Sequence, residues 1–245
     1  MKIIIANWKL NPQTIEEARS LASQIEHGLL GIERRGLETA ICPPFVFLPA
    51  VRHAIHFAHL GAQNVAAEES GPFTGEISVG QLREFKTEYV IVGHSERRAM
   101  GEDDKLINRK LKLVLKHKLE PILCVGAGTK KEHSNAAVKK IVKKQLGAAL
   151  AGLSSSAPKL TIAYEPVWAI SRGLGTGQAV TPAHAAEIIG FIKSQAPKAR
   201  VIYGGSVDSK NASGLAKAKI IEGALVGGAS LKALEFLQII KAFSQ

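Results

Sequence analysis

Short apolar segments alternate with amphipathic segments along the whole chain of 245 residues. The apolar segments have the length and composition of buried strands: 3–7, 39–42, 59–63, 89–93, 121–125, 160–165, 200–203 and 221–226. Each precedes a segment with apolar residues at helical spacing: 14–30, 48–57, 79–85, 104–117, 136–153, 182–195, 211–218 and 231–243. This alternation predicts an α/β fold, a (β/α)8 barrel formed as a single domain by residues 1–245. A doubly wound sheet is the alternative, although it usually needs fewer units.

The segment after the sixth expected strand combines a carboxylate with a glycine-rich loop. Glu165 directly precedes Pro166, which removes a backbone donor and favours an extended conformation before it, so we expect the strand to end at Glu165. The run Ser171-Arg172-Gly173-Leu174-Gly175-Thr176-Gly177 follows. A carboxylate at a strand end before a flexible loop favours a catalytic base under a lid. A plain surface loop is the other interpretation.

Polar residues or glycines follow four other expected strands. The runs are Asn7-Trp8-Lys9, Gly93-His94-Ser95-Glu96, Gly204-Gly205-Ser206 and Gly227-Gly228-Ala229-Ser230. If the first strand continued past Asn7, Lys9 would share its face and Trp8 would point away. Barrel enzymes carry their chemistry where the carboxyl ends of the strands meet, and glycine-rich loops before helices expose backbone N–H groups that bind phosphate. Together these runs indicate an enzyme with a phosphorylated substrate, although each alone could be structural.

The formal net charge of +11 comes largely from residues 109–118 and 139–144, which read as amphipathic helices with outward lysines. Such charge favours anionic substrates. Nucleic-acid binding is not expected, because no aromatic residues interleave with the lysines to stack on bases.

The chain has no apolar run of membrane-spanning length, and its first apolar run is too short for a signal peptide. Cys42 and Cys124 lie in apolar segments, so we expect buried reduced thiols and a cytoplasmic location.

Several ordered motifs resemble those of the triosephosphate isomerase family. They are Asn-Trp-Lys at 7–9, Phe-Thr-Gly-Glu at 73–76, Val-Gly-His-Ser-Glu-Arg-Arg at 92–98, Leu-Cys-Val-Gly at 123–126, Ala-Tyr-Glu-Pro-Val-Trp-Ala-Ile at 163–170, Tyr-Gly-Gly-Ser-Val at 203–207 and Leu-Val-Gly-Gly-Ala-Ser at 225–230. The resemblance runs nearly end to end and implies a TIM barrel that interconverts dihydroxyacetone phosphate and glyceraldehyde 3-phosphate. It implies no metal or other cofactor.

The resemblance also implies roles for residues at the strand ends. Glu165 is expected to be the base that moves a proton between adjacent carbons through an enediolate. His94 is expected to polarise the substrate oxygen as a neutral imidazole, and Lys9 to supply positive charge. Asn7 is expected to donate a further hydrogen bond, and Glu96 to position Lys9 and His94, although a simple charge at a helix start is an equal alternative for Glu96.

The implied phosphate site uses backbone N–H groups of Gly227 and Gly228, the region of Ser206, and Gly175 of the lid loop at 166–178. The family usually runs from Ala-Ile directly into Gly-Thr-Gly, whereas residues 171–174 intervene here, so the lid is unusually long. The run Ala127-Gly128-Thr129-Lys130-Lys131 also replaces a stretch that is often acidic in the family.

The loop at 65–78, including Thr74, resembles the family's interface loop and implies a homodimer, with a tetramer left open. The implied pathways are glycolysis and gluconeogenesis, and the sequence does not fix the direction.

Two other enzyme classes stay open at this stage: a metal-dependent epimerase, which needs carboxylate and His ligands, and a Schiff-base aldolase, for which Lys9 could superficially serve. A nucleic-acid or scaffold role based on charge is a third class.

Overall fold

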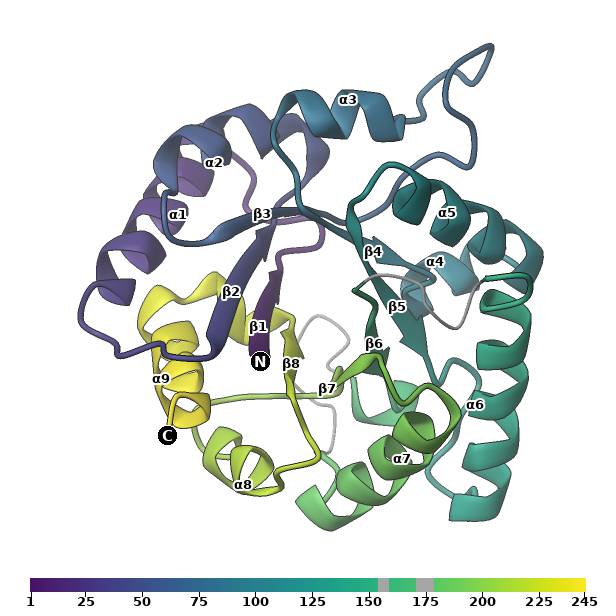
Figure 1. Ribbon diagram of the computed structural model, residues 1–245. Coiled ribbons are helices and arrows are strands. Elements are labelled where there is room, and N and C mark those ends of the chain that lie inside the picture. The colour runs from purple at the N-terminus through teal and green to yellow at the C-terminus, as the bar shows by residue number, and fades with distance from the viewer. Residues whose placement is uncertain (154–158, 171–178) are drawn as a thin grey trace.

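Eight parallel strands close into a barrel in chain order in the computed structural model, with helices around it (Figure 1). The structure describes residues 1–153, 159–170 and 179–245. The strands are β1 (Lys2–Asn7), β2 (Leu37–Cys42), β3 (His59–Ala62), β4 (Tyr89–Val92), β5 (Glu120–Val125), β6 (Thr161–Tyr164), β7 (Arg200–Tyr203) and β8 (Gly223–Val226). Pairing of β8 with β1 closes the barrel and confirms the predicted fold class.

The helices of the described residues cover the outside of the barrel. They are α1 (Ile15–Leu29), α2 (Leu48–Ala54), α3 (Val79–Glu84), α4 (Ser95–Ala99), α5 (Asp104–Lys116), α6 (Asn135–Ala149), α7 (Pro182–Gln195), α8 (Ala212–Lys217) and α9 (Ala233–Phe243). Short 3-10 turns lie at Phe45–Phe47, Val167–Ala169 and Gly228–Leu231. The helix expected at 48–57 ends early, and the one expected at 136–153 ends at Ala149.

Apolar residues form two layers, one inside the barrel and one between the barrel and its helices. In β1, Ile3 and Ile5 belong to the inner cluster, while Ile4 and Ala6 belong to the outer one. This division follows from the two-residue period of a strand, which sends successive side chains to opposite faces. Both faces of the strands are therefore buried, as in other parallel sheets.

Side-chain caps fix where several helices begin. The Thr14 side chain accepts from the Glu17 N–H, and the Glu17 side chain accepts from the Thr14 N–H, a reciprocal capping box at the start of α1. Ser134 caps α6 by accepting from the Ala137 N–H at 3.3 Å, so this helix starts earlier than the apolar pattern suggested. Both caps satisfy backbone donors that the first turn leaves free.

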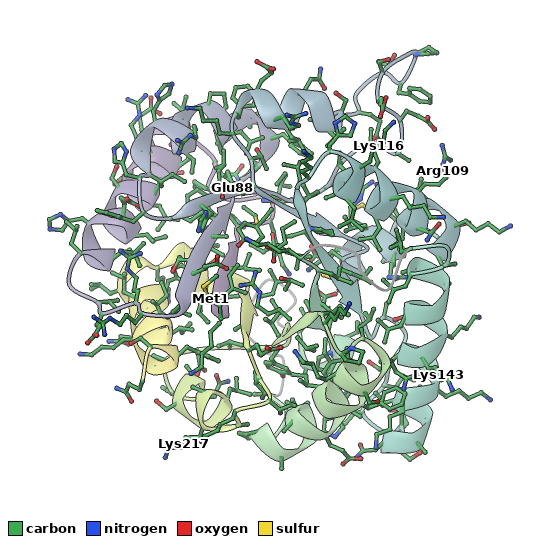
Figure 2. All side chains as sticks on the ribbon, in the orientation of Figure 1. Met1, Glu88, Arg109, Lys116, Lys143 and Lys217 are labelled. Atoms are coloured by element: carbon green, nitrogen blue, oxygen red, sulfur yellow. The ribbon has the colours of Figure 1, made fainter. Side chains whose placement is uncertain are left out.

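The lysine-rich segments form α5 and α6, with most of their charge directed outward. Figure 2 shows Arg109, Lys116 and Lys143 pointing away from the barrel. Lys110 corrects the expectation that all these lysines face solvent, because it is 2% exposed and lies 2.8 Å from Asn64 Oδ1. It also pairs with the buried carboxylate of Glu102, which neutralises a charge that burial would otherwise disfavour.

No helix within the described residues is long and apolar enough to span a membrane.

Candidate active site

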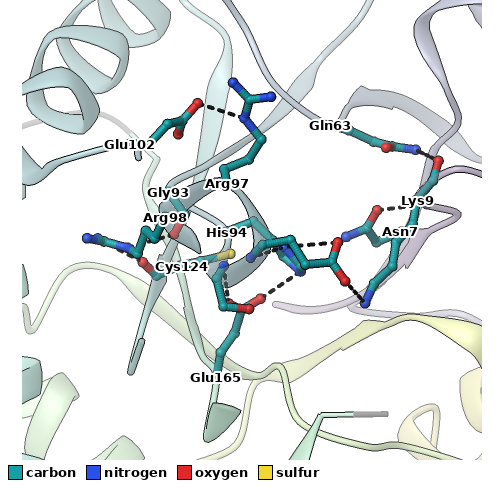
Figure 3. A network of polar contacts seen from close by, with 12 residues as sticks. Asn7, Lys9, Gln63, Gly93, His94, Arg97, Arg98, Glu102, Cys124 and Glu165 are labelled. Carbon is teal, nitrogen blue, oxygen red and sulfur yellow. Dashed lines mark hydrogen bonds and ion pairs between the residues drawn. The ribbon is translucent and has the colours of Figure 1, made fainter. Parts of the chain in front are cut away.

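Asn7, Lys9, His94 and Glu165 gather at the carboxyl ends of β1, β4 and β6 (Figure 3). Glu96 joins them through its contacts with Lys9 and His94. The Lys9 Nζ lies 2.7 Å from Glu96 Oε1, and the His94 Nε2 lies 3.1 Å from Glu165 Oε1. These contacts join three strand ends that are far apart in the sequence. The structure therefore brings together the five residues that were predicted from the sequence to be catalytic.

The Glu165 carboxylate is almost completely shielded, with 1% of the residue exposed. Its strand ends at Tyr164, one residue earlier than expected, but the Glu165 N–H still donates to Val125 O at 2.7 Å. Its Oε2 accepts from the Ser95 N–H at 2.9 Å. His94 Nε2 lies close to Oε1, but the geometry of this contact is not that of a hydrogen bond. One carboxylate oxygen is thus anchored, and the other faces the imidazole.

The His94 ring is oriented by the backbone that follows it. His94 caps the short helix α4, and its Nδ1 accepts from the Glu96 N–H at 3.3 Å. When Nδ1 accepts, the proton of a neutral ring lies on Nε2, an assignment that follows from the hydrogen-bond network. The Glu96 Oε2 also lies 3.7 Å from Nδ1. With Nδ1 bound at the start of α4, Nε2 is the ring nitrogen that faces Glu165.

Lys9 reaches the site from a turn rather than from a continued strand. β1 ends at Asn7, and Lys9 has a left-handed φ of 54°. The Lys9 N–H donates to Asn7 Oδ1 at 3.1 Å, while Gln63 Nε2 donates to Lys9 O at 2.9 Å. The condition under which Lys9 would share a strand face with Asn7 is therefore not met, because the strand ends at Asn7. Trp8 is fully buried in the outer layer of the core.

The two glycine-rich loops after β7 and β8 lie near these residues. A Cβ built on Gly227 would lie 3.6 Å from the Lys9 Cε, so the loop after β8 is a neighbour of the lysine. Among the residues that the structure describes, no atom other than those of the glycine and its chain neighbours lies within 4 Å of the corresponding position on Gly228. In the loop after β7, the Ser206 N–H and Oγ both donate to Ala169 O, at 3.0 and 2.7 Å. Gly175, the expected lid contact, lies outside the described residues.

Three further groups contribute to the site without having been singled out from the sequence. The Ser95 N–H binds Glu165, and Gln63 donates to both Lys9 O and Cys42 O. Gln63 directly follows β3, so its place at a strand end could have revealed it, whereas a backbone donor such as that of Ser95 leaves no signal. Burial raises the pKa of the Cys124 thiol well above its ordinary value, and the charge of nearby Glu165 adds to the shift.

Both cysteines are free and buried, as expected. Among the residues that the structure describes, no three His, Cys, Asp or Glu side chains are grouped as metal ligands would be. A cavity of about 230 Å³ lies at the opposite, amino-terminal end of the barrel, where Arg200, Glu38 and Glu120 line it. Arg200 pairs with both carboxylates, and Lys193, which also lines the cavity, pairs with Glu222.

Comparison with known proteins agrees with this geometry. A family model described as "Triosephosphate isomerase" matches residues 2–243. The chain is 42% identical over 251 residues to the triosephosphate isomerase of Endomicrobium trichonymphae, covering 98% of this chain and 97% of that protein. It is 43% identical over 251 residues to the enzyme of Carboxydothermus hydrogenoformans, covering 97% of each. It is 39% identical over 254 residues to that of Legionella pneumophila, covering 99% of each.

Proposed function

The chain belongs to the triosephosphate isomerase family, and from this premise we propose that it interconverts dihydroxyacetone phosphate and glyceraldehyde 3-phosphate. The observation that carries the proposal is the grouping of the Glu165 carboxylate, His94 Nε2 and Lys9 Nζ at one end of the barrel. The neighbouring loops after β7 and β8 offer backbone N–H groups for a phosphate dianion.

Glu165 is the base in this proposal. Starting from dihydroxyacetone phosphate, it takes a proton from the hydroxyl-bearing carbon beside the carbonyl and returns it to the former carbonyl carbon, while the hydroxyl proton passes to the former carbonyl oxygen. One carbon is oxidised as its neighbour is reduced, so no external oxidant or reductant is needed. Burial of the carboxylate excludes water that would compete for this proton. Because the Ser95 N–H binds its Oε2 in this structure, we infer that Glu165 exchanges that hydrogen bond for the substrate C–H when substrate enters.

His94 and Lys9 stabilise the oxygens of the enediolate. His94 Nε2–H donates to a substrate oxygen, because the Glu96 N–H already occupies Nδ1. Lys9 supplies a fixed positive charge, and its pairing with Glu96 at 2.7 Å holds that charge in place. Asn7 both orients the turn at Lys9 and offers an amide donor. A Schiff-base aldolase would need a lysine free to attack a carbonyl, which this pairing does not favour.

Phosphate binding is assigned to Gly227, Gly228, Ser206 and Gly175. Since both Ser206 donors contact Ala169 O here, its use for phosphate requires the first part of the lid loop, which contains Ala169, to move. We infer that the lid loop at 166–178 closes over the phosphate, and that residues 171–174 change the balance between its open and closed states. Deleting residues 171–174 should change kcat or KM, whereas unchanged kinetics and unchanged lid order would contradict the inference.

The first test is isomerisation of glyceraldehyde 3-phosphate by the purified protein and by Glu165→Gln. Removing the base should lower kcat about 100- to 10,000-fold. Glu26→Gln is the matched control, because Glu26 is also buried but its carboxylate binds the backbone N–H groups of His56, Phe57 and Ala58, far from the site. Absence of turnover by the folded wild-type protein, or equal losses in the two variants, would overturn the proposal.

We also propose a homodimer formed through the loop at 65–78, which projects from the barrel between β3 and α3 (Figure 1). Phe73 in this loop is 46% exposed, and Leu10, Val46 and Met100 are exposed in loops after β1, β2 and α4. Exposed large apolar residues are typical of an interface where they form one continuous patch, and Thr74 lies beside Phe73 in the part proposed to enter the partner. Sedimentation at micromolar concentration should give a dimer; a tetramer would extend the interface, and a monodisperse monomer would contradict it.

A triosephosphate isomerase serves glycolysis, and because the reaction is reversible it can serve gluconeogenesis as well. We propose a cytoplasmic location, supported by the two buried thiols, which fit a reducing compartment.

A further inference from the structure

The loop that follows β5 lies directly against the backbone of Glu165. Gly126 in this loop has a left-handed φ of 112°, and a Cβ built on it would lie 2.4 Å from Glu165 O. No side chain fits there, so the two backbones are in van der Waals contact. Any displacement of this loop must therefore reach the residue proposed as the base.

Gln145 of α6 fixes this loop from one side. Its Oε1 accepts from the Gly126 N–H at 2.7 Å, and its Nε2 donates to Ala127 O at 2.8 Å. The side chain is buried, and the two bonds use opposite ends of one amide, so they determine its orientation. A helix on the outside of the barrel is thereby joined to the loop that contacts Glu165.

Thr129 fixes the same loop from the other side and extends the connection. Its hydroxyl donates to Gly126 O at 2.7 Å and accepts from the Val167 N–H at 3.4 Å. Thr129 is 4% exposed, so water does not compete for these bonds. Val167 is two residues after Glu165, which means that Thr129 holds the chain on the far side of the proposed base.

We propose that Thr129 and Gln145 are positioning residues that hold Glu165 in its reactive geometry. The inference rests on the proposed isomerase function, because it assigns Glu165 the role of the base. Neither residue contacts the proposed reacting groups; they act by fixing the loop that lies against Glu165 O and the backbone two residues after the base. Displacement of a reacting group by about 1 Å can lower a rate about 100-fold. Loss of the hydrogen bonds made by Thr129 or Gln145 should therefore lower kcat.

The test compares Thr129→Val, Thr129→Ser and Thr161→Val with the wild-type protein. Valine keeps the shape of threonine but neither donates nor accepts, while serine keeps the hydroxyl. Thr161→Val is the matched control, because it removes a buried hydroxyl that donates to Glu120 at 2.8 Å at the start of the same strand that leads to Glu165. Both valine variants lose one buried hydroxyl, but only one of these hydroxyls lies beside the site.

We expect Thr129→Val to lower kcat about tenfold with KM within about twofold of wild type, and Thr129→Ser to restore most of the loss. Gln145→Met should lower kcat in the same way. It tests the hydrogen bonds from α6 to the loop after β5 even if Thr129→Val does not fold. Equal kcat in Thr129→Val and Thr161→Val, or no loss in Gln145→Met, would overturn the positioning role while wild-type turnover still supported the isomerase. An inactive wild-type protein would instead overturn the isomerase proposal and this inference with it.

Discussion

Lys9 and Lys86 share a left-handed backbone conformation, with φ of 54° and 55°, but only Lys9 pairs with a carboxylate at the candidate site. Lys9→Met keeps most of the side chain and removes its charge. If Lys9 stabilises the developing oxyanion, kcat/KM should fall about 100- to 1,000-fold. Lys86→Met removes the same charge from the same backbone conformation and should leave kcat/KM within about twofold. Steady-state kinetics of both variants would check this, and similar values for the two would remove Lys9 from the mechanism.

The sequence was informative about residues whose side chains lie at strand ends and uninformative about residues that bind backbone atoms. Glu165 and His94 could be found because each follows an apolar strand and carries a reactive group. Thr129 and Gln145 could not be found, because threonine and glutamine are common and their partners are backbone atoms of Gly126, Ala127 and Val167. Only the folded chain shows that these partners lie against the proposed base.

At the scale of secondary-structure elements, the buried carboxylate of Glu26 links α1 to the turn between α2 and β3. Glu26 of α1 accepts from the N–H of His56 at 2.7 Å, from that of Phe57, and from that of Ala58 at 3.1 Å, in the turn between α2 and β3. In Glu26→Gln one accepting oxygen is replaced by an NH2 group that faces backbone donors. We expect a loss of about 1–3 kcal/mol in the free energy of unfolding, measured in urea.

Glu33→Gln is the control for this prediction, because Glu33 is exposed and the same change should alter stability by less than about 0.5 kcal/mol. Equal unfolding midpoints for the Glu26 and Glu33 variants would show that the three backbone contacts contribute little to stability.

The same contact explains one error in the predicted element boundaries. Apolar spacing extended a helix over residues 48–57, but α2 ends at Ala54, and the backbone donors that follow bind Glu26 instead. At the end of α6, which was also mispredicted, Asn108 of α5 donates to the carbonyls of Ala149 and Ala151 just where the helix stops. At both ends the backbone binds a side chain 30 or more residues away in sequence, which no local pattern can include.

The topology of the whole molecule was easier to predict than these boundaries. Eight strand–helix units leave few arrangements for a parallel sheet with right-handed crossovers, and closure between β8 and β1 completes the barrel. The lid could not be treated in the same way: residues 171–178 lie outside the described part of the chain, and the sequence indicates only that the loop is long.

Arg200 of β7 closes the amino-terminal end of the barrel by pairing with Glu38 of β2 and Glu120 of β5. Burial alone raises the pKa of Glu38, but the hydrogen bond and charge of Arg200 outweigh this effect, and the pKa lies below its ordinary value. The ionised Glu38 therefore stabilises the fold above the unfolded-state pKa of about 4.3, and this contribution is lost as the pH falls through the folded-state pKa.

In Arg200→Met the burial of Glu38 is no longer offset, so ionising this carboxylate should destabilise the fold at neutral pH. We expect a loss of about 3 kcal/mol in the free energy of unfolding at pH 7. The loss should shrink toward pH 4, because burial without Arg200 raises the pKa of Glu38 in the variant, so protonation removes the unpaired charge there while the wild type still keeps its ion pair. Arg109→Met breaks an exposed pair with Glu68 and should cost less than about 1 kcal/mol. Urea unfolding of both variants between pH 4 and pH 8 measures these differences, and a pH-independent loss in Arg200→Met would show that packing of the arginine, rather than its charge, holds this end of the barrel closed.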